Sequence, residues 1–188
     1  MKQTSAFPVL ETPRLVLRQL GQDDAPVILR LRGEKEMLKY IEMYRIKSLD
    51  EASEMIETHR KKFTEGKGLI WGIQFKGESS LIGYLGYHTI ILEHFRAEVC
   101  YLLLPEFWNS GIIKEAMNSI TSFAFMEMNL HRLEAVIMKG NNSSVQIALN
   151  AGYRKEAQLR QHIFYQGRFY DYMIYAMIRE DYEKRQYR

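Results

Sequence analysis

The sequence predicts a single α/β or α+β domain built around a mixed β-sheet, and three observations predict it. Segments in which apolar and polar residues alternate are typical of half-buried strands, and segments with apolar residues three or four positions apart are typical of helices. These segments are interleaved, in the order strand, helices, three strands, helix, strand, helix and two strands. With 188 residues, 46% of them hydrophobic, and with no repeat or linker, the chain is expected to form one domain over residues 1–188.

The first third of the chain is expected to hold one strand and two helices. The segment "ETPRLVLRQL" alternates from Arg14 to Leu20 and predicts a strand. Residues 22–32 predict a short helix, whose acidic residues at the start suit the helix dipole. Residues 48–63 predict a second helix, because Ser48 and Glu51 have the spacing of a capping box.

The middle of the chain predicts three successive strands followed by a helix. The strands are expected at residues 68–75, 81–92 and 97–104, and the first two are joined by "KGESS", a turn of hairpin length. We therefore expect the three strands to be antiparallel neighbours. A helix is expected after Gly111, because apolar residues then recur at helical spacing.

The last third predicts a strand, a helix and a final pair of strands. Residues 132–138 are expected to form the strand, and residues 143–152 a helix that Gly152 ends. Residues 153–165 and 168–178 are expected to form two strands that a short turn joins.

Composition excludes several classes of protein. The net charge is only +3 and the basic residues are scattered, which argues against nucleic-acid binding. No apolar run reaches the roughly 18 to 20 residues of a membrane-spanning helix, and no signal-peptide pattern opens the chain. The lone Cys100 favours a reducing, cytoplasmic location and is expected in the core, not as a nucleophile. The five histidines lack metal-ligand spacing, so no metal is expected.

The most informative motif is "LLLPEFWNSGIIKEA", residues 102–116, where a predicted strand turns into a helix. A helix start has unpaired backbone N–H groups and a partial positive charge, so it suits a phosphate group. Gly111 would let the backbone approach such a ligand closely. From the residues of this motif alone, a plain helix cap made by Ser110 or Asn109 with a turn glycine is the favoured explanation. The motif is neither a Walker loop nor a dinucleotide-binding fingerprint.

A second polar loop follows the strand predicted at residues 132–138. "KGNNSSVQIALNAGY" contains four residues in a row that can cap a helix, Asn141 to Ser144. Ligands in open α/β sheets bind where strands end. Two neighbouring strand ends are therefore expected to deliver polar atoms to one crevice.

Four segments together resemble the GNAT superfamily of acetyl-CoA-dependent N-acetyltransferases. They are "ETPRLVLRQLGQDDA", "YLLLPEFWNSGIIKEAMNSITSFAF", "LHRLEAVIMKGNNSSVQIALNAGYRKEAQLR" and "GRFYDYMIYAMIREDY", which cover nearly the whole chain in the family's order. The chain is similar, more narrowly, to the branch that acetylates the N-termini of ribosomal proteins. The resemblance implies a mostly antiparallel central sheet with splayed middle strands and flanking helices. It also implies acetyl-CoA as co-substrate.

The resemblance also implies which residues bind coenzyme A. The pantetheine arm is expected along the strand at Leu102, Leu103 and Leu104. The pyrophosphate is expected on the following loop and helix start, and an Asn and a Ser three residues later are expected near the thioester. These residues are Asn109, Ser110, Gly111, Ile112, Ile113, Asn141 and Ser144. Ile113 departs from the family, which has a small residue there, and adds bulk beside the cofactor.

The implied reaction is the attack of a neutral amine on the acetyl thioester. It requires a base for the amine, polarisation of the carbonyl oxygen and an acid for the leaving thiolate. Glu98 is the candidate base, and its alternative is a structural ion pair on the sheet. Ser144 is the candidate acid or thiol contact, and its alternative is an ordinary helix hydroxyl. Backbone N–H groups around Leu102 are expected to polarise the carbonyl.

Three functional hypotheses stay open at the level of the sequence. The acceptor is the N-terminus of a protein, or a small amine such as an antibiotic or a polyamine, or the chain is a coenzyme A-binding module without turnover. The acceptor cleft is expected between residues 23–62 and 162–172. Its candidate aromatic lining is Tyr40, Tyr44, Phe164, Tyr165, Phe169 and Tyr170. Exposed strand edges near the last hairpin could form a homodimer contact.

Overall fold

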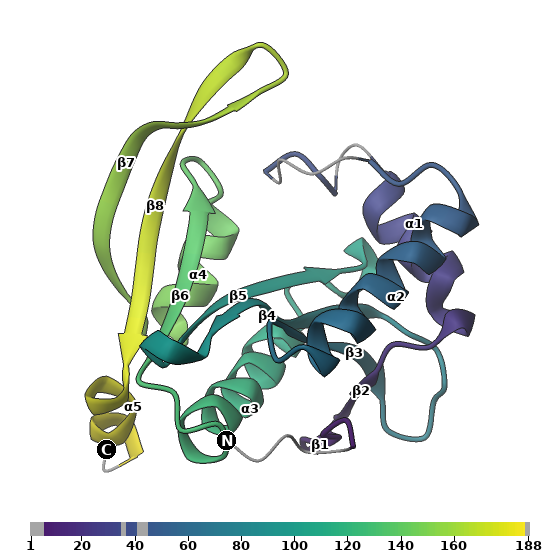
Figure 1. The fold of residues 1–188 in the computed structure, drawn as a ribbon, viewed down its shortest axis with the longest axis horizontal. Helices are drawn as coiled ribbons and strands as arrows, with labels where there is room; N and C mark the ends of the chain where they lie inside the picture. Colours follow the sequence, from purple (N-terminus) through teal and green to yellow (C-terminus); the bar gives the residue numbers. More distant parts are fainter. Residues whose placement is uncertain (1–5, 35–36, 41–44, 187–188) are drawn as a thin grey trace.

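The computed structural model describes residues 6–34, 37–40 and 45–186, and its centre is a twisted eight-stranded sheet (Figure 1). The strands lie in the order β1-β2-β3-β4-β5-β6-β8-β7. Their bounds are β1 Leu10–Glu11, β2 Leu15–Gln19, β3 Leu69–Phe75, β4 Gly83–Ile91, β5 Arg96–Leu103, β6 Arg132–Met138, β7 Arg154–Tyr165 and β8 Arg168–Ile178. All neighbouring pairs among these strands are antiparallel except β5 and β6, which are parallel.

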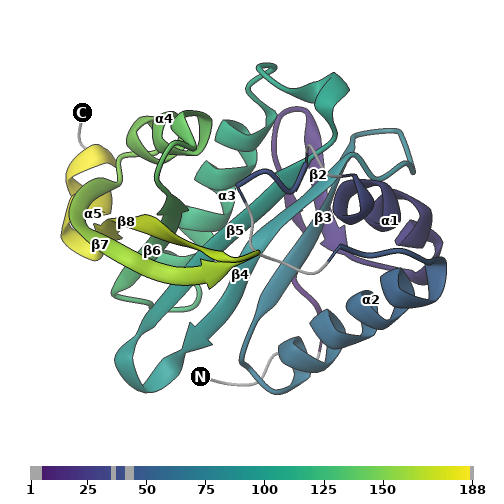
Figure 2. The ribbon, with the colours of Figure 1, turned by 90° about the horizontal axis from the view of Figure 1, so that it is seen from above.

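Helices cover both faces of the sheet (Figure 2). The α-helices are α1 Ala25–Gly33, α2 Leu49–Thr64, α3 Ile112–Met126, α4 Asn142–Asn150 and α5 Arg179–Gln186. Helices α1 and α2 pack on one face and share an apolar cluster with Ile70, Tyr84 and Leu102. Helices α3 and α4 pack on the other face around a larger cluster that includes the fully buried Trp71 and Phe125. Each face of the sheet thus has its own core.

The predicted fold class is confirmed, and local chemistry explains the helix boundaries. The Ser48 hydroxyl caps α2 by accepting a hydrogen bond from the Glu51 N–H at 3.2 Å, as its spacing predicts. The reciprocal bond differs from a standard capping box, because the Glu51 carboxylate accepts the N–H of Lys47 at 2.7 Å. Gly152 ends α4 with a positive φ of 92°, a conformation that favours glycine.

The central strands β5 and β6 separate after a short parallel contact. They pair only from Arg96 to Glu98 on β5 and from Arg132 to Glu134 on β6. Beyond Glu98, β5 stays paired with β4 on its other side, whereas β6 follows β8. The divergence leaves one edge of β5 without a strand partner in the middle of the sheet.

Candidate active site

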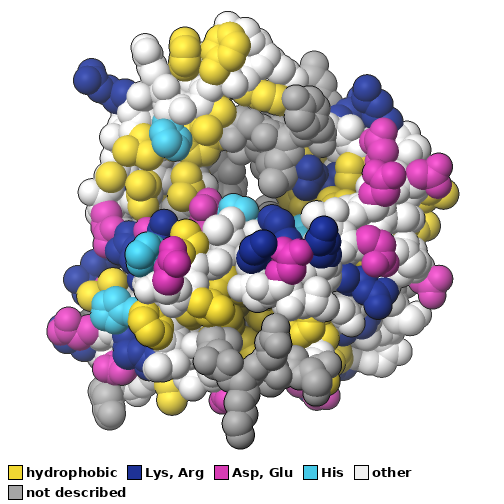
Figure 3. All heavy atoms as spheres, in the orientation of Figure 1, with side chains coloured by type: hydrophobic (Ala, Val, Ile, Leu, Met, Phe, Trp, Pro, Cys, Tyr) yellow, Lys and Arg dark blue, Asp and Glu magenta, His cyan; other side chains and the backbone are white. Residues whose placement is uncertain are grey.

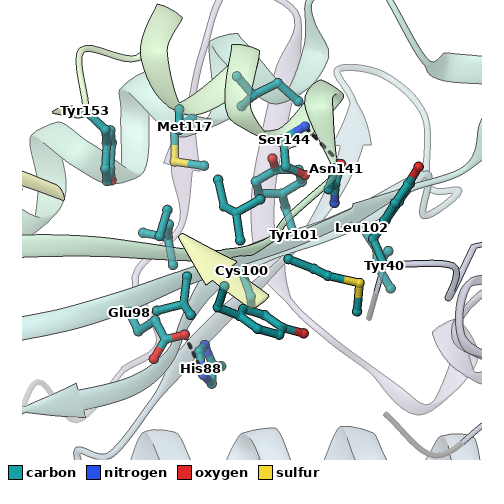
Figure 4. Close-up of a pocket in the computed structure, with 18 of the residues that line it drawn as sticks. Tyr40, His88, Glu98, Cys100, Tyr101, Leu102, Met117, Asn141, Ser144 and Tyr153 are labelled. Atoms are coloured by element: carbon teal, nitrogen blue, oxygen red, sulfur yellow. Dashed lines mark hydrogen bonds and ion pairs between the residues drawn. The ribbon is translucent and has the colours of Figure 1, made fainter. Parts of the chain in front are cut away.

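A cavity of about 430 Å³ opens where β5 and β6 separate. Strands β4 to β8 and helices α1 to α4 contribute to its wall, together with Tyr40 and Tyr153. The face drawn in Figure 3 is hollowed between the β7–β8 hairpin and the α1 side of the sheet. The lining includes four of the residues expected in the site, Glu98, Leu102, Asn141 and Ser144 (Figure 4).

The two catalytic candidates approach the cavity from opposite faces of the sheet. Side chains alternate along a strand, so Glu98, Cys100 and Leu102 share one face of β5, and Tyr101 lies on the other. Glu98 lies near His88 of β4, whereas Tyr101 lies next to Ser144 of α4 (Figure 4). The cavity therefore has one side with a carboxylate and another with a hydroxyl.

The Glu98 carboxylate lies in a partly desolvated position next to another acid. Its side chain is 30% exposed, and burial together with the neighbouring Glu134 raises its pKa to about 7, against the opposing effect of Arg96. Glu134 is held by two arginines, with Arg96 at 2.6 Å and Arg132 at 2.7 Å. The ion pair that was the alternative for Glu98 is thus formed by Glu134. Glu98 instead has the pKa of a group that can accept a proton near neutral pH.

A bulge in β4 brings His88 to Glu98. The pairing register shifts between Tyr87 and Thr89, so His88 is an extra residue opposite β5. Its Nε2 atom lies 3.6 Å from the Glu98 Oε1 atom. Burial and the charge of Lys62 lower the pKa of His88. A neutral imidazole therefore accompanies the carboxylate.

His59 of α2 adds a second neutral imidazole to this side of the cavity. Burial and the nearby charges of Lys62 and Arg32 lower its pKa to about 4. Both ring nitrogens are shielded from solvent and lack a hydrogen-bond partner in the described chain. Cys100 lies close by, and burial raises the pKa of its thiol to about 12. A thiol with that pKa stays protonated, which supports a packing role over a nucleophilic one.

Ser144 lies in the first turn of α4, on the opposite side of the cavity. The Asn141 side chain caps this helix, because its Oδ1 atom accepts the Ser144 N–H at 3.1 Å. That bond uses the Asn141 oxygen that could otherwise face a ligand, whereas its amide nitrogen stays available. Tyr101 of β5 lies against Ser144, and burial raises the pKa of its phenol to about 12.

The ladder between β4 and β5 decides which backbone groups face the gap. The Leu104 N–H donates to the Ile82 oxygen at 3.0 Å, which makes these two residues a hydrogen-bonded pair. Such pairs alternate along antiparallel strands, so the Leu102 N–H also faces β4. The N–H groups of Tyr101 and Leu103 point instead toward the gap. The N–H groups that face the gap around Leu102 are thus those of its two neighbours, whereas the Leu102 side chain lines the cavity.

The loop expected to hold the pyrophosphate leads from β5 into α3. It is not part of the cavity wall. Gly111, with a φ of 78°, takes the capping position without a side-chain bond, and Asn109 also has a positive φ of 57°. The Ser110 hydroxyl donates to the Phe107 carbonyl, so it does not cap α3. A side chain added at Gly111 would meet only the Arg14 guanidinium, at 3.6 Å, which leaves the helix start open to a ligand.

The branched residues at the start of α3 point into the core. Ile112 and Ile113 are 1% and 7% exposed, and both belong to the apolar cluster on the α3 face. The bulk of Ile113 is thus accommodated inside the domain, and its backbone N–H remains among the unpaired groups of the first helical turn. The buried Leu103 and Leu104 lie just before this loop, and the Leu103 oxygen accepts the Trp108 ring N–H at 2.7 Å.

The two segments expected to form the acceptor cleft, residues 23–62 and 162–172, both contribute to the cavity wall. Of the expected aromatic lining, Tyr40 is present, Tyr44 lies outside the described residues, and the others are elsewhere on the hairpin. Arg32, His59, His162 and Tyr172 lie within these segments, although the sequence did not indicate them individually, whereas Tyr84 and His88 of β4 lie outside them. Only a break in strand alternation near His88 could have indicated one of them.

Other kinds of site are absent from the described part of the chain. Residues 6–34, 37–40 and 45–186 contain no group of three or more His, Cys, Asp or Glu side chains that could hold a metal ion. Over the same residues, no helix is long and apolar enough to cross a membrane.

Comparison with known proteins places this architecture in a family. A family model described as an acetyltransferase (GNAT) domain matches residues 14–154. The chain is 34% identical over 173 residues to the uncharacterized N-acetyltransferase YoaA of Bacillus subtilis (strain 168), a match that covers 92% of this chain and 98% of YoaA. It is 25% identical over 158 residues to a spermidine N(1)-acetyltransferase of Vibrio cholerae, with 84% of this chain and 89% of the relative covered.

A solved structure agrees with the fold. A RimL ribosomal L7/L12 alpha-N-protein acetyltransferase in complex with coenzyme A matches with a TM-score of 0.84 at 16% identity, covering 91% of this chain and 98% of the other. At that identity the likeness shows the fold alone. The family match and the YoaA identity carry the assignment: the chain belongs to the GNAT family and is an acetyl-CoA-dependent N-acetyltransferase.

Proposed function

We propose that this enzyme acetylates the N-terminal α-amine of a protein, for example a ribosomal protein. The observation that carries the proposal is the position of Glu98 in the cavity between β5 and β6. The pKa of this carboxyl group is about 7. An α-amine has a pKa of about 7.7 to 8.0, so a base with a pKa near 7 can deprotonate it readily. A lysine amine, with a pKa of about 10.4, would need a stronger base.

The charge of the cavity wall supports the same acceptor. Among its described residues, Glu98 is the single carboxylate, and it is accompanied by Arg32 and three histidines. A polyamine carries several positive charges and would be better matched by an acidic wall. The second candidate is nevertheless a small amine, because a relative at 25% identity is a spermidine N(1)-acetyltransferase.

We assign roles to the residues of this chain as follows. Acetyl-CoA supplies the thioester as co-substrate. The N–H groups of Tyr101 and Leu103 bind its pantetheine arm or polarise the carbonyl oxygen, since they face the gap. The start of α3, Asn109 to Ile113, holds the pyrophosphate, for which its open helix end is suited. Asn141 contacts the cofactor arm through its amide nitrogen.

Proton transfer is divided between the two sides of the cavity. Glu98 accepts the proton of the attacking amine, directly or through one water molecule. The nitrogen lone pair forms the new amide bond while the bond between carbon and sulfur breaks. Ser144 then donates a hydrogen bond to the departing sulfur, which leaves with the bonding electron pair. The opposite placement of Glu98 and Ser144 keeps the base away from the leaving group.

We also propose that the enzyme acts in the cytoplasm. A separate proposal is that two copies of the chain associate through the exposed edge strand β7. β7 lies at the end of the sheet and most of its residues are exposed. Size-exclusion chromatography with light scattering tests the dimer, and a purely monomeric mass at micromolar concentration would contradict it.

A thiol-release assay with a panel of acceptors tests the proposed acceptor. The panel pairs peptides that have a free α-amine with the same peptides blocked at the N-terminus, and adds N-acetyl-lysine amide and spermidine. We expect release only with free α-amines, and a loss of about 100-fold in Glu98→Gln, in line with the usual contribution of a general base. Glu93→Gln, in which an exposed carboxylate is altered, is the control. Preferred turnover of spermidine would select the second candidate.

A further inference from the structure

Arg14 connects the beginning of the chain to the loop that precedes α3. It lies directly before β2, and its Nη1 atom donates a hydrogen bond to the Ser110 carbonyl oxygen at 3.2 Å. Its Nε atom donates to the Glu115 carboxylate, in the first turn of α3, at 2.7 Å. One half-exposed side chain thus bonds both to the loop and to the helix that follows the loop.

The Glu115 carboxylate holds Arg14 in this position. Its Oε1 atom accepts the backbone N–H of Arg14 at 2.9 Å and the hydroxyl of Thr12 at 2.6 Å, while its Oε2 atom accepts the Arg14 Nε–H. An ion pair that is supported by several hydrogen bonds and is partly buried is better ordered than an isolated surface pair. The guanidinium is therefore fixed beside the loop before any ligand binds.

The bond to Ser110 fixes the orientation of the peptide group between Ser110 and Gly111. In a trans peptide the carbonyl oxygen and the N–H point in opposite directions, and the described residues contain no cis peptide bond. Because the oxygen is directed at Arg14, the Gly111 N–H points away from Arg14. Within residues 6–34, 37–40 and 45–186 this N–H donates no backbone hydrogen bond, so it is available to an anion.

The loop has no other tether of this kind. Asn109 and Gly111 have positive φ values of 57° and 78°, and such values are uncommon for a residue that has a side chain. In the part of the chain that the structure describes, Arg14 is the one side chain outside the loop that bonds to the backbone of residues 109–111. The loop conformation therefore depends on a residue nearly a hundred positions earlier.

We propose that Arg14 is a positioning residue for coenzyme A, which holds the peptide between Ser110 and Gly111 so that the Gly111 N–H faces the pyrophosphate. The proposal rests on the pyrophosphate site assigned above to the start of α3. Arg14 acts through the Ser110 carbonyl and needs no contact with the cofactor. An N–H that is already oriented binds an anion without the cost of ordering the loop. Its loss should weaken binding about tenfold, as expected for a hydrogen bond to a charged group.

A binding experiment tests this role without any acceptor. Calorimetry measures the Kd of coenzyme A in wild type, Arg14→Met, Arg14→Lys and Arg154→Met. Arg154 is the control, since it is an exposed arginine that pairs with Asp181 at 2.6 Å and makes no bond to the loop. We expect about tenfold weaker binding in Arg14→Met and a change below about twofold in Arg154→Met.

Arg14→Lys separates orientation from charge. Lysine keeps the positive charge but lacks the planar guanidinium that bonds Glu115 and Ser110 together, so it should weaken binding about as much as methionine. Wild-type affinity in Arg14→Lys would overturn the proposal, because charge alone would then explain the effect of Arg14. An unchanged Kd in Arg14→Met would overturn it as well.

A kinetic experiment separates positioning from general damage to the fold. It compares acetyl-CoA with acetyl-pantetheine, which lacks the pyrophosphate and the adenosine. We expect Arg14→Met to raise the KM for acetyl-CoA about tenfold with kcat within about twofold, and to leave kcat/KM for acetyl-pantetheine within about twofold of wild type. Equal losses with both acetyl donors would overturn the role of Arg14 alone. Equal use of both donors by the wild type would overturn the pyrophosphate site at α3, and the role of Arg14 with it.

Discussion

Replacing His59 by phenylalanine should make the protein less sensitive to acid. In the folded protein the pKa of His59 is about 4, whereas an unfolded histidine has a pKa of about 6.5. Between these two values the unfolded chain binds more protons, so the wild type loses stability as the pH falls from 6.5 toward 4. Phenylalanine keeps an aromatic ring near Tyr84, whose centroid lies 6.4 Å from that of His59, and removes the titration.

The size of the effect follows from the two pKa values. The linkage relation predicts that the free energy of unfolding falls by about 1.3 kcal/mol between pH 7.5 and pH 5.5 because of His59 alone. At lower pH this loss reaches at most about 3.4 kcal/mol. Urea unfolding followed by tryptophan fluorescence at both pH values measures it. The difference in unfolding free energy between the two pH values should be about 1.3 kcal/mol smaller in His59→Phe than in wild type.

A control histidine separates this effect from a general response to acid. His94 is 64% exposed in its side chain, and His94→Phe should leave the wild-type pH dependence within about 0.5 kcal/mol. An identical pH dependence in wild type and His59→Phe would refute the reasoning, because it would mean that His59 titrates alike in the folded and unfolded states.

Two further predictions concern stability. Glu98→Gln should raise the unfolding free energy at pH 8 by roughly 1 to 3 kcal/mol and have little effect at pH 4.5. The reason is that burial and Glu134 raise the pKa of this acid, so its ionised form is disfavoured in the folded protein. A loss of stability at pH 8 in urea titrations would contradict this prediction. Gly86→Ala should lower stability by at least about 3 kcal/mol, since its new carbon would lie 2.1 Å from the Leu69 carbonyl oxygen. Gly21→Ala, with open space around it, should change the unfolding midpoint little by comparison.

The sequence predicts most of the secondary structure because each element has a local cause. The segments expected to be strands correspond to β2 to β8, and Ser48 marks the start of α2. Two elements were missed. β1 is only two residues long, and α5 buries Tyr182 alone, so neither has a periodic pattern. The turn at residues 22–24 was predicted as part of α1, but it is a separate 3-10 turn before Ala25.

The site was harder to predict because it depends on pairing between distant strands. The gap exists because β6 leaves β5 after Glu98, and no local pattern shows where two strands part. The same limit explains why the sequence cannot say which N–H groups around Leu102 face the gap, since the direction of an N–H follows from the partner strand. His88 reaches Glu98 through a bulge in β4, which only the register reveals.

The role of Glu98 as the base is tested most directly by the pH dependence of kcat/KM for an α-amine peptide in wild type and in Glu98→Gln. In wild type we expect a rising limb to which Glu98 contributes an ionisation near pH 7, in addition to that of the peptide amine at about pH 8. In Glu98→Gln the ionisation near pH 7 should be lost, leaving a much slower reaction that follows the peptide amine alone at about pH 8. An unchanged rate and an unchanged pH profile in Glu98→Gln would show that Glu98 is not the base.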